Sequence, residues 1–109
     1  MARTNGYVGT IESETVGVAR LWFGLRSEPS GGEWVTIGPT RAWFMMNMDS
    51  ADRPSHMAQL TLLLEAMRSG LQVQVGHGGA TSEVHHNQEN DAFEVEGLRI
   101  LRGDLHFSE

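Results

Sequence analysis

Histidine is the residue type in this chain best suited to chemistry, and three of the five histidines lie close together. They share one stretch with three carboxylates: His77, Glu83, His85, His86, Glu89 and Asp91. Imidazole and carboxylate groups together are ligands for zinc, nickel and similar ions, and His106 would complete such a site. The spacing matches no metal-binding motif on a helix, and adjacent side chains on a strand point to opposite faces. We favour a polar, solvated loop here, with a metal site formed by His77, His85, His86 and His106 as the alternative.

Paired carboxylates are the second arrangement with a chemical use. Glu94 and Glu96 lie two residues apart, which places both on one face of an extended strand. A catalytic pair also needs a cleft and a shifted pKa, and the alternation with Phe93 and Val95 is typical of a solvent-facing strand surface. The chain has no cysteine and no lysine, which excludes thiol catalysis, disulfides and Schiff-base chemistry. We therefore predict no catalytic residues and a protein that is not an enzyme.

Tryptophan and arginine form the third set, because an exposed indole on a barrel surface stacks on sugar rings or bases. Trp34 lies beside a glycine-rich stretch, and Trp22 and Arg41 are near enough in the sequence to join the same sheet face. Packing within a core or between subunits is the favoured role for the aromatic residues as a group. Trp34, Arg41 and Trp22 are the candidates for ligand binding.

The balance of charge limits the partners. Fourteen Asp and Glu residues against eight arginines give a formal net charge of −6, opposite to the positive surface that phosphate backbones require. Nucleic acid is therefore a disfavoured ligand. No apolar run approaches the length that spans a bilayer, and none follows Arg3 as a signal peptide would need. We expect no membrane insertion and a cytoplasmic protein, or a secreted one if a leader has been removed.

The clearest element is a helix predicted over residues 54–69. Its apolar residues fall at helical spacing and form a stripe that we expect to face the core: Met57, Leu60, Leu63, Leu64 and Met67. Pro54 suits the first turn of this helix, and Gly70 suits a left-handed C-cap.

Strands are predicted on both sides of the helix from alternation and turn residues. Before the helix we expect two strands joined at Ser13 and Glu14, then a loop, then one broken strand or two short ones: Tyr7–Glu12, Thr15–Leu25, Arg26–Glu33 and 33–47. After the helix we expect a strand, a long loop or irregular hairpin, and a last strand that Leu105 and Phe107 would extend: Leu71–Val75, 76–91 and Phe93–Leu101.

This order predicts one domain over residues 1–109, mainly β with one α-helix. A barrel with a single helix between its third and fourth strands is the OB-fold, so we predict an OB-fold-like barrel of five to six strands. The stretches that carry a further resemblance are Ala42-Trp43-Phe44, the helix from Ser55 to Ala66, Gly70 to Val75, and Leu98 to Leu101.

In this pattern the chain resembles the pentameric binding subunits of bacterial enterotoxins, over about its central half. The resemblance implies a ring in which the helices line a central channel and strands pair across subunits. The toxin members are secreted and usually carry a disulfide, whereas this chain has no cysteine. No sugar-binding motif aligns residue by residue, so the resemblance implies the fold and the oligomer and leaves the ligand open.

Surplus apolar residues next to the helix point to the same kind of assembly. Methionine is common at adaptable interfaces, and a strand that is apolar on both faces would leave a monomer with an exposed patch. The predicted subunit interface is Trp43, Met45, Met46, Met48 and Leu62.

Together these features predict a non-enzymatic, ring-forming binding module for a glycan, a peptide or a partner protein, without a cofactor. Two alternatives remain. One is an OB-fold that binds single-stranded nucleic acid, and the other is a small metal-dependent enzyme that uses the loop 77–91 and His106.

Overall fold

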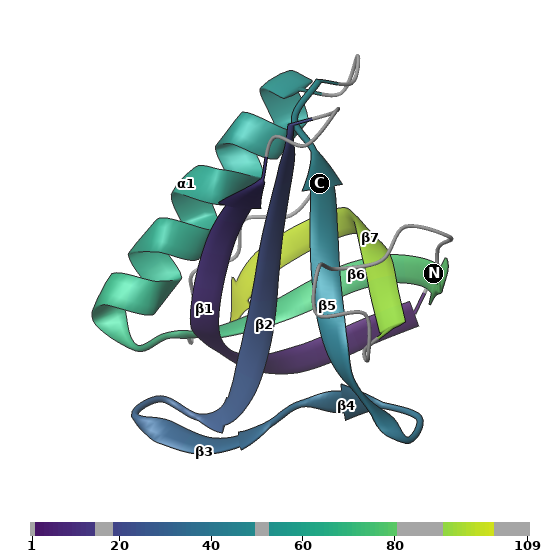
Figure 1. Ribbon diagram of the computed structural model, residues 1–109. Coiled ribbons are helices and arrows are strands. Elements are labelled where there is room, and N and C mark those ends of the chain that lie inside the picture. Colours follow the sequence, from purple (N-terminus) through teal and green to yellow (C-terminus); the bar gives the residue numbers. More distant parts are fainter. Residues whose placement is uncertain (1, 15–18, 50–52, 81–90, 102–109) are drawn as a thin grey trace.

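A computed structural model of the chain describes residues 2–14, 19–49, 53–80 and 91–101 (Figure 1). The elements in these ranges are, in order, β1 Ala2–Glu14, β2 Arg20–Glu28, β3 Gly31–Trp34, β4 Thr36–Ile37, β5 Thr40–Asn47, α1 Arg53–Ser69, β6 Gln72–Ala80 and β7 Asp91–Leu101. Among these residues no helix combines the length and the apolar character needed to cross a membrane.

Five of the strands close into a barrel in the order β1, β2, β5, β7, β6 and back to β1. The pairs β1–β2, β2–β5, β6–β7 and β1–β6 are antiparallel, and β5–β7 is parallel. The short strands β3 and β4 extend the edges of β2 and β5. Because α1 lies between the third and fourth barrel strands in sequence, the fold is the OB-fold-like barrel that the sequence predicts.

The long strand β1 serves two partners and bends between them (Figure 1). Residues 2–7 pair with β6, and residues from Tyr7 onward pair with β2, with a register shift between Val8 and Thr10. A Cβ on Gly6 would lie 2.9 Å from the Leu25 Cβ, so the two strands approach too closely here for a larger residue. The bulge and the close approach let one strand turn the corner of the barrel.

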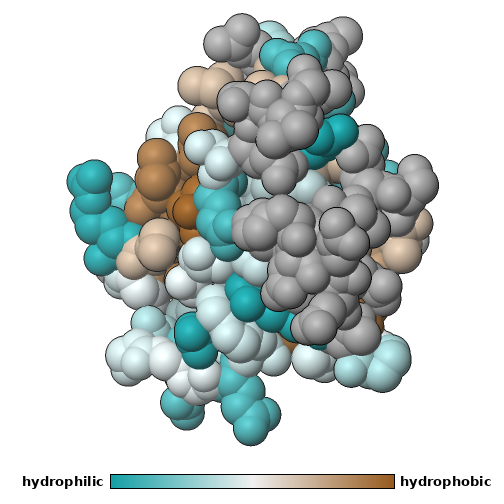
Figure 2. Space-filling model, viewed as in Figure 1, coloured by the Kyte–Doolittle hydropathy of each residue, from teal (hydrophilic) through white to brown (hydrophobic). Residues whose placement is uncertain are grey.

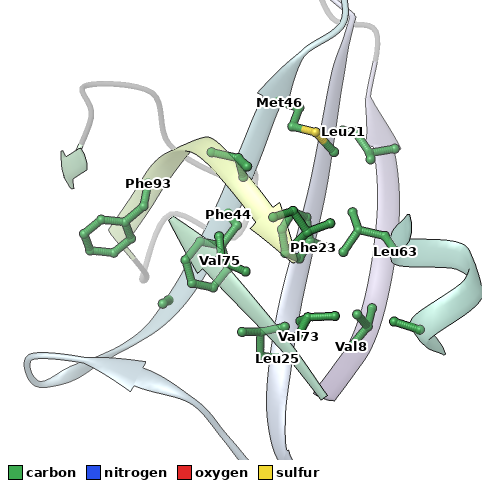
Figure 3. Close-up of a cluster of buried hydrophobic side chains, with 14 of the residues drawn as sticks. Val8, Leu21, Phe23, Leu25, Phe44, Met46, Leu63, Val73, Val75 and Phe93 are labelled. Atoms are coloured by element: carbon green, nitrogen blue, oxygen red, sulfur yellow. The ribbon is translucent and has the colours of Figure 1, made fainter. Parts of the chain in front are cut away.

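The barrel interior holds the main hydrophobic core (Figure 3). Phe23 and Phe44 stack at its centre with ring centroids 5.3 Å apart. Val73 and Val75 reach the core from β6, and Leu63 reaches it from α1. Every one of these side chains is fully buried, so the helix closes the barrel through the same cluster that fills it.

The helix bounds agree with the prediction to within one residue, since α1 spans Arg53–Ser69. Gly70 has a φ of 65°, the left-handed conformation expected of its C-cap. The amide of Leu71 donates to the carbonyl of Ala66 at 2.9 Å, which is the hydrogen bond of a Schellman motif. The chain therefore leaves the helix through a tight cap and enters β6 at once.

The face of the helix that packs on the barrel agrees with the prediction only in part, because Leu63 and Leu60 pack on the core as expected and three other residues do not. The buried positions are His56, Gln59, Leu63 and Ala66. Met57, Leu64 and Met67, which we expected in the core, are 45%, 48% and 44% exposed. We call these three residues the helix patch. Figure 2 shows hydrophobic side chains gathered over α1, on the left of the view.

The connections at the two ends of α1 explain this rotation. The His56 ring bonds through Nδ1 to the carbonyl oxygen of Asn47 at 2.8 Å, which fixes the first turn against the end of β5. The Schellman cap fixes the last turn above β6. With both ends held, the helix presents the polar side chains of His56 and Gln59 to the barrel in place of Met57 and Leu64.

The strands before the helix also differ from the prediction. β1 runs through Ser13 and Glu14, which we expected to form a turn, and β2 begins at Arg20. The predicted loop Arg26–Glu33 is largely a hairpin of β2 and β3 with its turn at Pro29 and Ser30, and β3 begins with Gly31 and Gly32 at φ values of 142° and 78°. β6 extends to Ala80 with irregular register, and residues 81–90, Leu105 and Phe107 lie outside the described residues.

Candidate ligand-binding site

The outer surface of β2 and β5 carries the aromatic and arginine side chains. On β2 the residues Leu21, Phe23 and Leu25 belong to the core, so alternation places the residues between them outside. The same alternation on β5 sends Phe44 and Met46 inward. The outward set is Trp22, Gly24 and Arg26 on β2, and Arg41, Trp43 and Met45 on β5, with Trp22 opposite Met45 in the register.

Three of these residues and Trp34 form a continuous stack. The guanidinium carbon of Arg26 lies 3.8 Å from the centroid of the Trp34 ring, and that of Arg41 lies 3.4 Å from it. Two guanidinium groups cannot share one face of an indole at these distances, so Trp34 lies between them. Arg41 is also 4.0 Å from the centroid of the Trp43 ring. The order is therefore Arg26, Trp34, Arg41 and Trp43, which we call the Arg–Trp stack.

Two glycines make room for the stack. A Cβ on Gly24 would lie 2.8 Å from Nη2 of Arg41, and a Cβ on Gly9 would lie 2.8 Å from both the Arg26 side chain and the Trp34 ring. A side chain at either position would displace a member of the stack. The stack thus depends on two positions without a side chain, on the neighbouring strands β1 and β2.

The environment of Arg41 is unusual for a cation. Its Nε and Nη2 atoms are buried, and neither has a hydrogen-bond partner. Desolvation by burial lowers the pKa of Arg41, Glu12 acts against this effect, and Arg26 adds to it. The two indole faces compensate part of this desolvation through cation–π attraction, which is worth about 2 kcal/mol in desolvated sites.

Arg26 connects the stack to the β2–β3 hairpin and to a groove. Its Nη1 donates to the carbonyl oxygen of Gly32 at 2.9 Å, which holds the side chain across the hairpin. A groove of about 550 Å³ lies on this side, between β1, the hairpin and the end of α1. Val8, Arg26, Pro29 and Met67 are among the residues that line it.

The structure brings Trp34 and Arg41 into direct contact, as expected of two residues in one site. Trp22 lies on the same outer face, in a buried cluster with Trp43, Met45 and Ala92. Arg26 and Trp43 were not among the sequence candidates for ligand binding. The signal that could have found Arg26 is its outward position in β2, but the fold-back of β3 that pairs it with Trp34 is not visible in the sequence.

The predicted subunit interface needs correction. Trp43, Met45 and Met46 are 2%, 3% and 0% exposed in the single chain, and Met46 belongs to the core. Met48 and Leu62 are partly buried and pack against that core. The predicted strand surface is therefore occupied within one chain, and among the residues that the structure describes the large apolar side chains left exposed are those of the helix patch.

His77 has a structural environment. It is 2% exposed and lies between the rings of Phe44 and Phe93, with centroid distances of 5.4 Å and 5.2 Å. Nδ1 lies 2.8 Å from the carbonyl oxygen of Gly78, which can only accept, so Nδ1 donates. The other ring nitrogen, Nε2, forms a hydrogen bond of 2.9 Å with the hydroxyl of Thr4. Both nitrogens are engaged, which removes His77 from the predicted metal set.

The remaining predicted metal ligands, His85, His86 and His106, lie outside the described residues. Within the described ranges no three His, Asp or Glu side chains gather closely enough to hold a metal ion. Glu94 and Glu96 are exposed on β7, on the face opposite its core residues.

A comparison of the chain with known protein families, with curated proteins and with solved structures finds no match in any of the three. The class that the geometry defines is an OB-fold-like barrel with one helix.

Proposed function

We propose that the protein is a non-catalytic binding module that assembles with copies of itself and binds a glycan, a peptide or a partner protein at the Arg–Trp stack. The observation that carries the proposal is the stack itself, an indole held between two guanidinium groups on the outer face of the barrel. Large, rigid aromatic side chains and arginine are the residue types that dominate binding sites.

The position of the stack supports a binding role. OB-folds bind their ligands on the barrel face that includes the second and third strands, which here are β2 and β5. Gly9 and Gly24 keep that face free of side chains that would displace the stack. The site is rigid, because hydrogen bonding and stacking fix Arg26, and ordered side chains lose little entropy when a ligand binds.

Self-assembly is the second part of the proposal, and the helix patch supports it. Met57, Leu64 and Met67 each leave close to half of a large apolar side chain exposed. Exposed apolar side chains that gather in one place mark interaction surfaces. The resemblance to pentameric enterotoxin subunits implies a ring with the helices lining its channel, and that arrangement would cover the helix patch.

The binding proposal can be tested by tryptophan fluorescence, because all three tryptophans lie on the outer face of β2, β3 and β5. We expect a glycan or a peptide from a screened panel to change the emission in a saturable way. Trp34→Ala should weaken this binding at least about tenfold, with Trp43 still present as the reporter.

Gln74→Ala is the matched control, because Gln74 lies on β6 in an exposed hydrogen bond with Asn5, away from the stack. It should leave the affinity unchanged. Equal affinity of the wild type and Trp34→Ala for every ligand in the panel would contradict the proposal. Saturable, salt-dependent binding of an oligonucleotide would instead favour the nucleic-acid alternative.

A further inference from the structure

The Arg–Trp stack concentrates positive charge on one small area of an acidic protein. The chain carries a net charge of −6, yet Arg26 and Arg41 lie on the two faces of the same indole ring. Arg26 lowers the pKa of Arg41, and Glu12 raises it. Two cations therefore lie on one ring in a protein whose total charge is negative.

Part of the hydrogen-bonding capacity of Arg41 is also unused. A guanidinium has five N–H donors, and those on Nε and Nη2 of Arg41 are buried without an acceptor. Buried donors without a partner cost about 1–3 kcal/mol each, and more when they are charged. Stacking between Trp34 and Trp43 covers both faces of the group, so an acceptor has to approach in the plane of the guanidinium, where Nε and Nη2 are buried in the single chain.

An anion would both balance the positive charge of the two arginines and accept hydrogen bonds from Arg41. A carboxylate or a phosphate accepts two parallel hydrogen bonds from a guanidinium edge, in the geometry that arginine favours. Its negative charge would also offset the desolvation that lowers the pKa of Arg41. A neutral ring stacked on Trp34 would do neither, because both faces of that indole are already covered.

We infer that the ligand of this site presents an anionic group, a carboxylate or a phosphate, to the guanidinium edges of Arg41 and Arg26 beside Trp34. The inference rests on the proposed binding function and names the chemistry of its ligand. The groove of about 550 Å³ on the Arg26 side, with Val8, Pro29 and Met67 in its lining, gives the uncharged remainder of such a ligand a place to lie.

The test compares a charged probe with its neutral isostere. Glutarate carries two carboxylates, glutaramide has the same shape without charge, and inorganic pyrophosphate supplies the phosphate arm. Tryptophan emission of the full chain is measured against each probe. We expect glutarate or pyrophosphate to bind at least about tenfold more tightly than glutaramide, which corresponds to about 1.4 kcal/mol of binding free energy. The anion that binds more tightly identifies the carboxylate or phosphate source.

Substitutions assign the binding to the stack. Arg41→Gln and Arg26→Gln should each weaken binding of the anion about tenfold, and Arg41→Lys should weaken it as well because lysine lacks the planar fork. Arg99→Gln removes the same charge from β7, outside the stack, and should change the affinity less than about twofold. Near-ultraviolet circular dichroism of the tryptophans shows whether each variant keeps its fold. If the Arg41 variants do not fold, Arg26→Gln still tests the inference.

Three results would overturn the inference. They are binding of glutaramide as tight as that of both anions, weakening by Arg99→Gln equal to that by Arg41→Gln, and no response to either anion at millimolar concentration. A neutral glycan or peptide that binds in a Trp34-dependent manner would exclude an anionic ligand while the proposed function stands. Loss of Trp34 dependence for every ligand would instead contradict the proposed function.

Discussion

At the residue scale, His77 shows how a histidine can look like a ligand and act as a core residue. Its ring joins two strands through Thr4 and contacts Phe44 and Phe93. Nothing in the sequence around His77 separates this environment from a metal site, because the partner Thr4 lies at the other end of the chain. The β1–β6 register, which places Ala2 opposite His77, brings the two side chains together.

Removing the hydroxyl of Thr4 should destabilise the protein. Thr4→Val keeps the shape of the side chain but leaves Nε2 of the buried His77 without its partner, so we expect a loss of about 1–2 kcal/mol in the free energy of unfolding. Urea denaturation measures it. Gln74→Ala, which removes an exposed hydrogen bond to Asn5, should cost less than about 0.5 kcal/mol. Equal losses for the two variants would show that the bond to His77 contributes nothing.

Two glycines should respond differently to the same change. A Cβ at Gly6 meets the Cβ of Leu25 and the backbone carbonyl of Arg26, which cannot move away, so Gly6→Ala should cost about 1–3 kcal/mol of stability. A Cβ at Gly24 meets the end of the flexible Arg41 side chain. Gly24→Ala should therefore displace Arg41 and weaken ligand binding, with a smaller loss of stability.

Thermal unfolding and tryptophan emission, measured on both variants, separate these effects. A Gly24→Ala protein with unchanged emission and unchanged affinity would show that the Arg–Trp stack tolerates a side chain beneath it.

At the scale of elements, the helix was predicted well in its extent and only partly in its orientation, because Leu63 and Leu60 of the expected stripe pack on the core. Helical spacing and Gly70 locate its ends, because caps and periodicity are local properties of the sequence. The buried face is set by the hydrogen bond from His56 to β5 and by the tight cap before β6. Both contacts involve neighbouring elements, which an apolar stripe cannot reveal, so Met57, Leu64 and Met67 were wrongly expected in the core.

Two adjacent leucines measure that orientation directly. Leu63→Ala empties a fully buried position and should cost about 2–5 kcal/mol of stability. Leu64→Ala changes a side chain that is 48% exposed and should cost less than about 1 kcal/mol. Chemical denaturation of the two variants checks the difference, and the opposite ranking would mean that Leu64, and not Leu63, faces the core.

At the scale of the whole molecule, the barrel and the place of its helix follow from the order of predicted strands. The strand bounds do not, because β1 divides its length between two partners and alternation cannot reveal a bend. The candidate site was found in part. Trp34 and Arg41 were named as candidates from their residue types. Arg26 belongs to the site because the β2–β3 register places it opposite Trp34, and that register is not visible in the sequence.

Self-assembly through the helix patch predicts a native mass that is a multiple of the 12.0 kDa chain. Leu64→Gln should shift light scattering toward the single chain, because a polar side chain at a buried apolar contact loses about 1–3 kcal/mol. Ala58→Gln places the same side chain on an exposed position outside the patch and should leave the mass unchanged. A mass of 12.0 kDa for the wild type at micromolar concentration would contradict assembly.

The parallel pairing of β5 with β7 has a kinetic consequence. It joins Ala42 to Asp91 and Met45 to Glu94, so the barrel cannot close until residues far apart in the sequence have come into contact. Such pairings are slow because loop-closure entropy is lost before any contact compensates it. The hairpin of β2 and β3 needs no such encounter, so the Arg26 and Trp34 pair can form before the barrel that later carries it is complete.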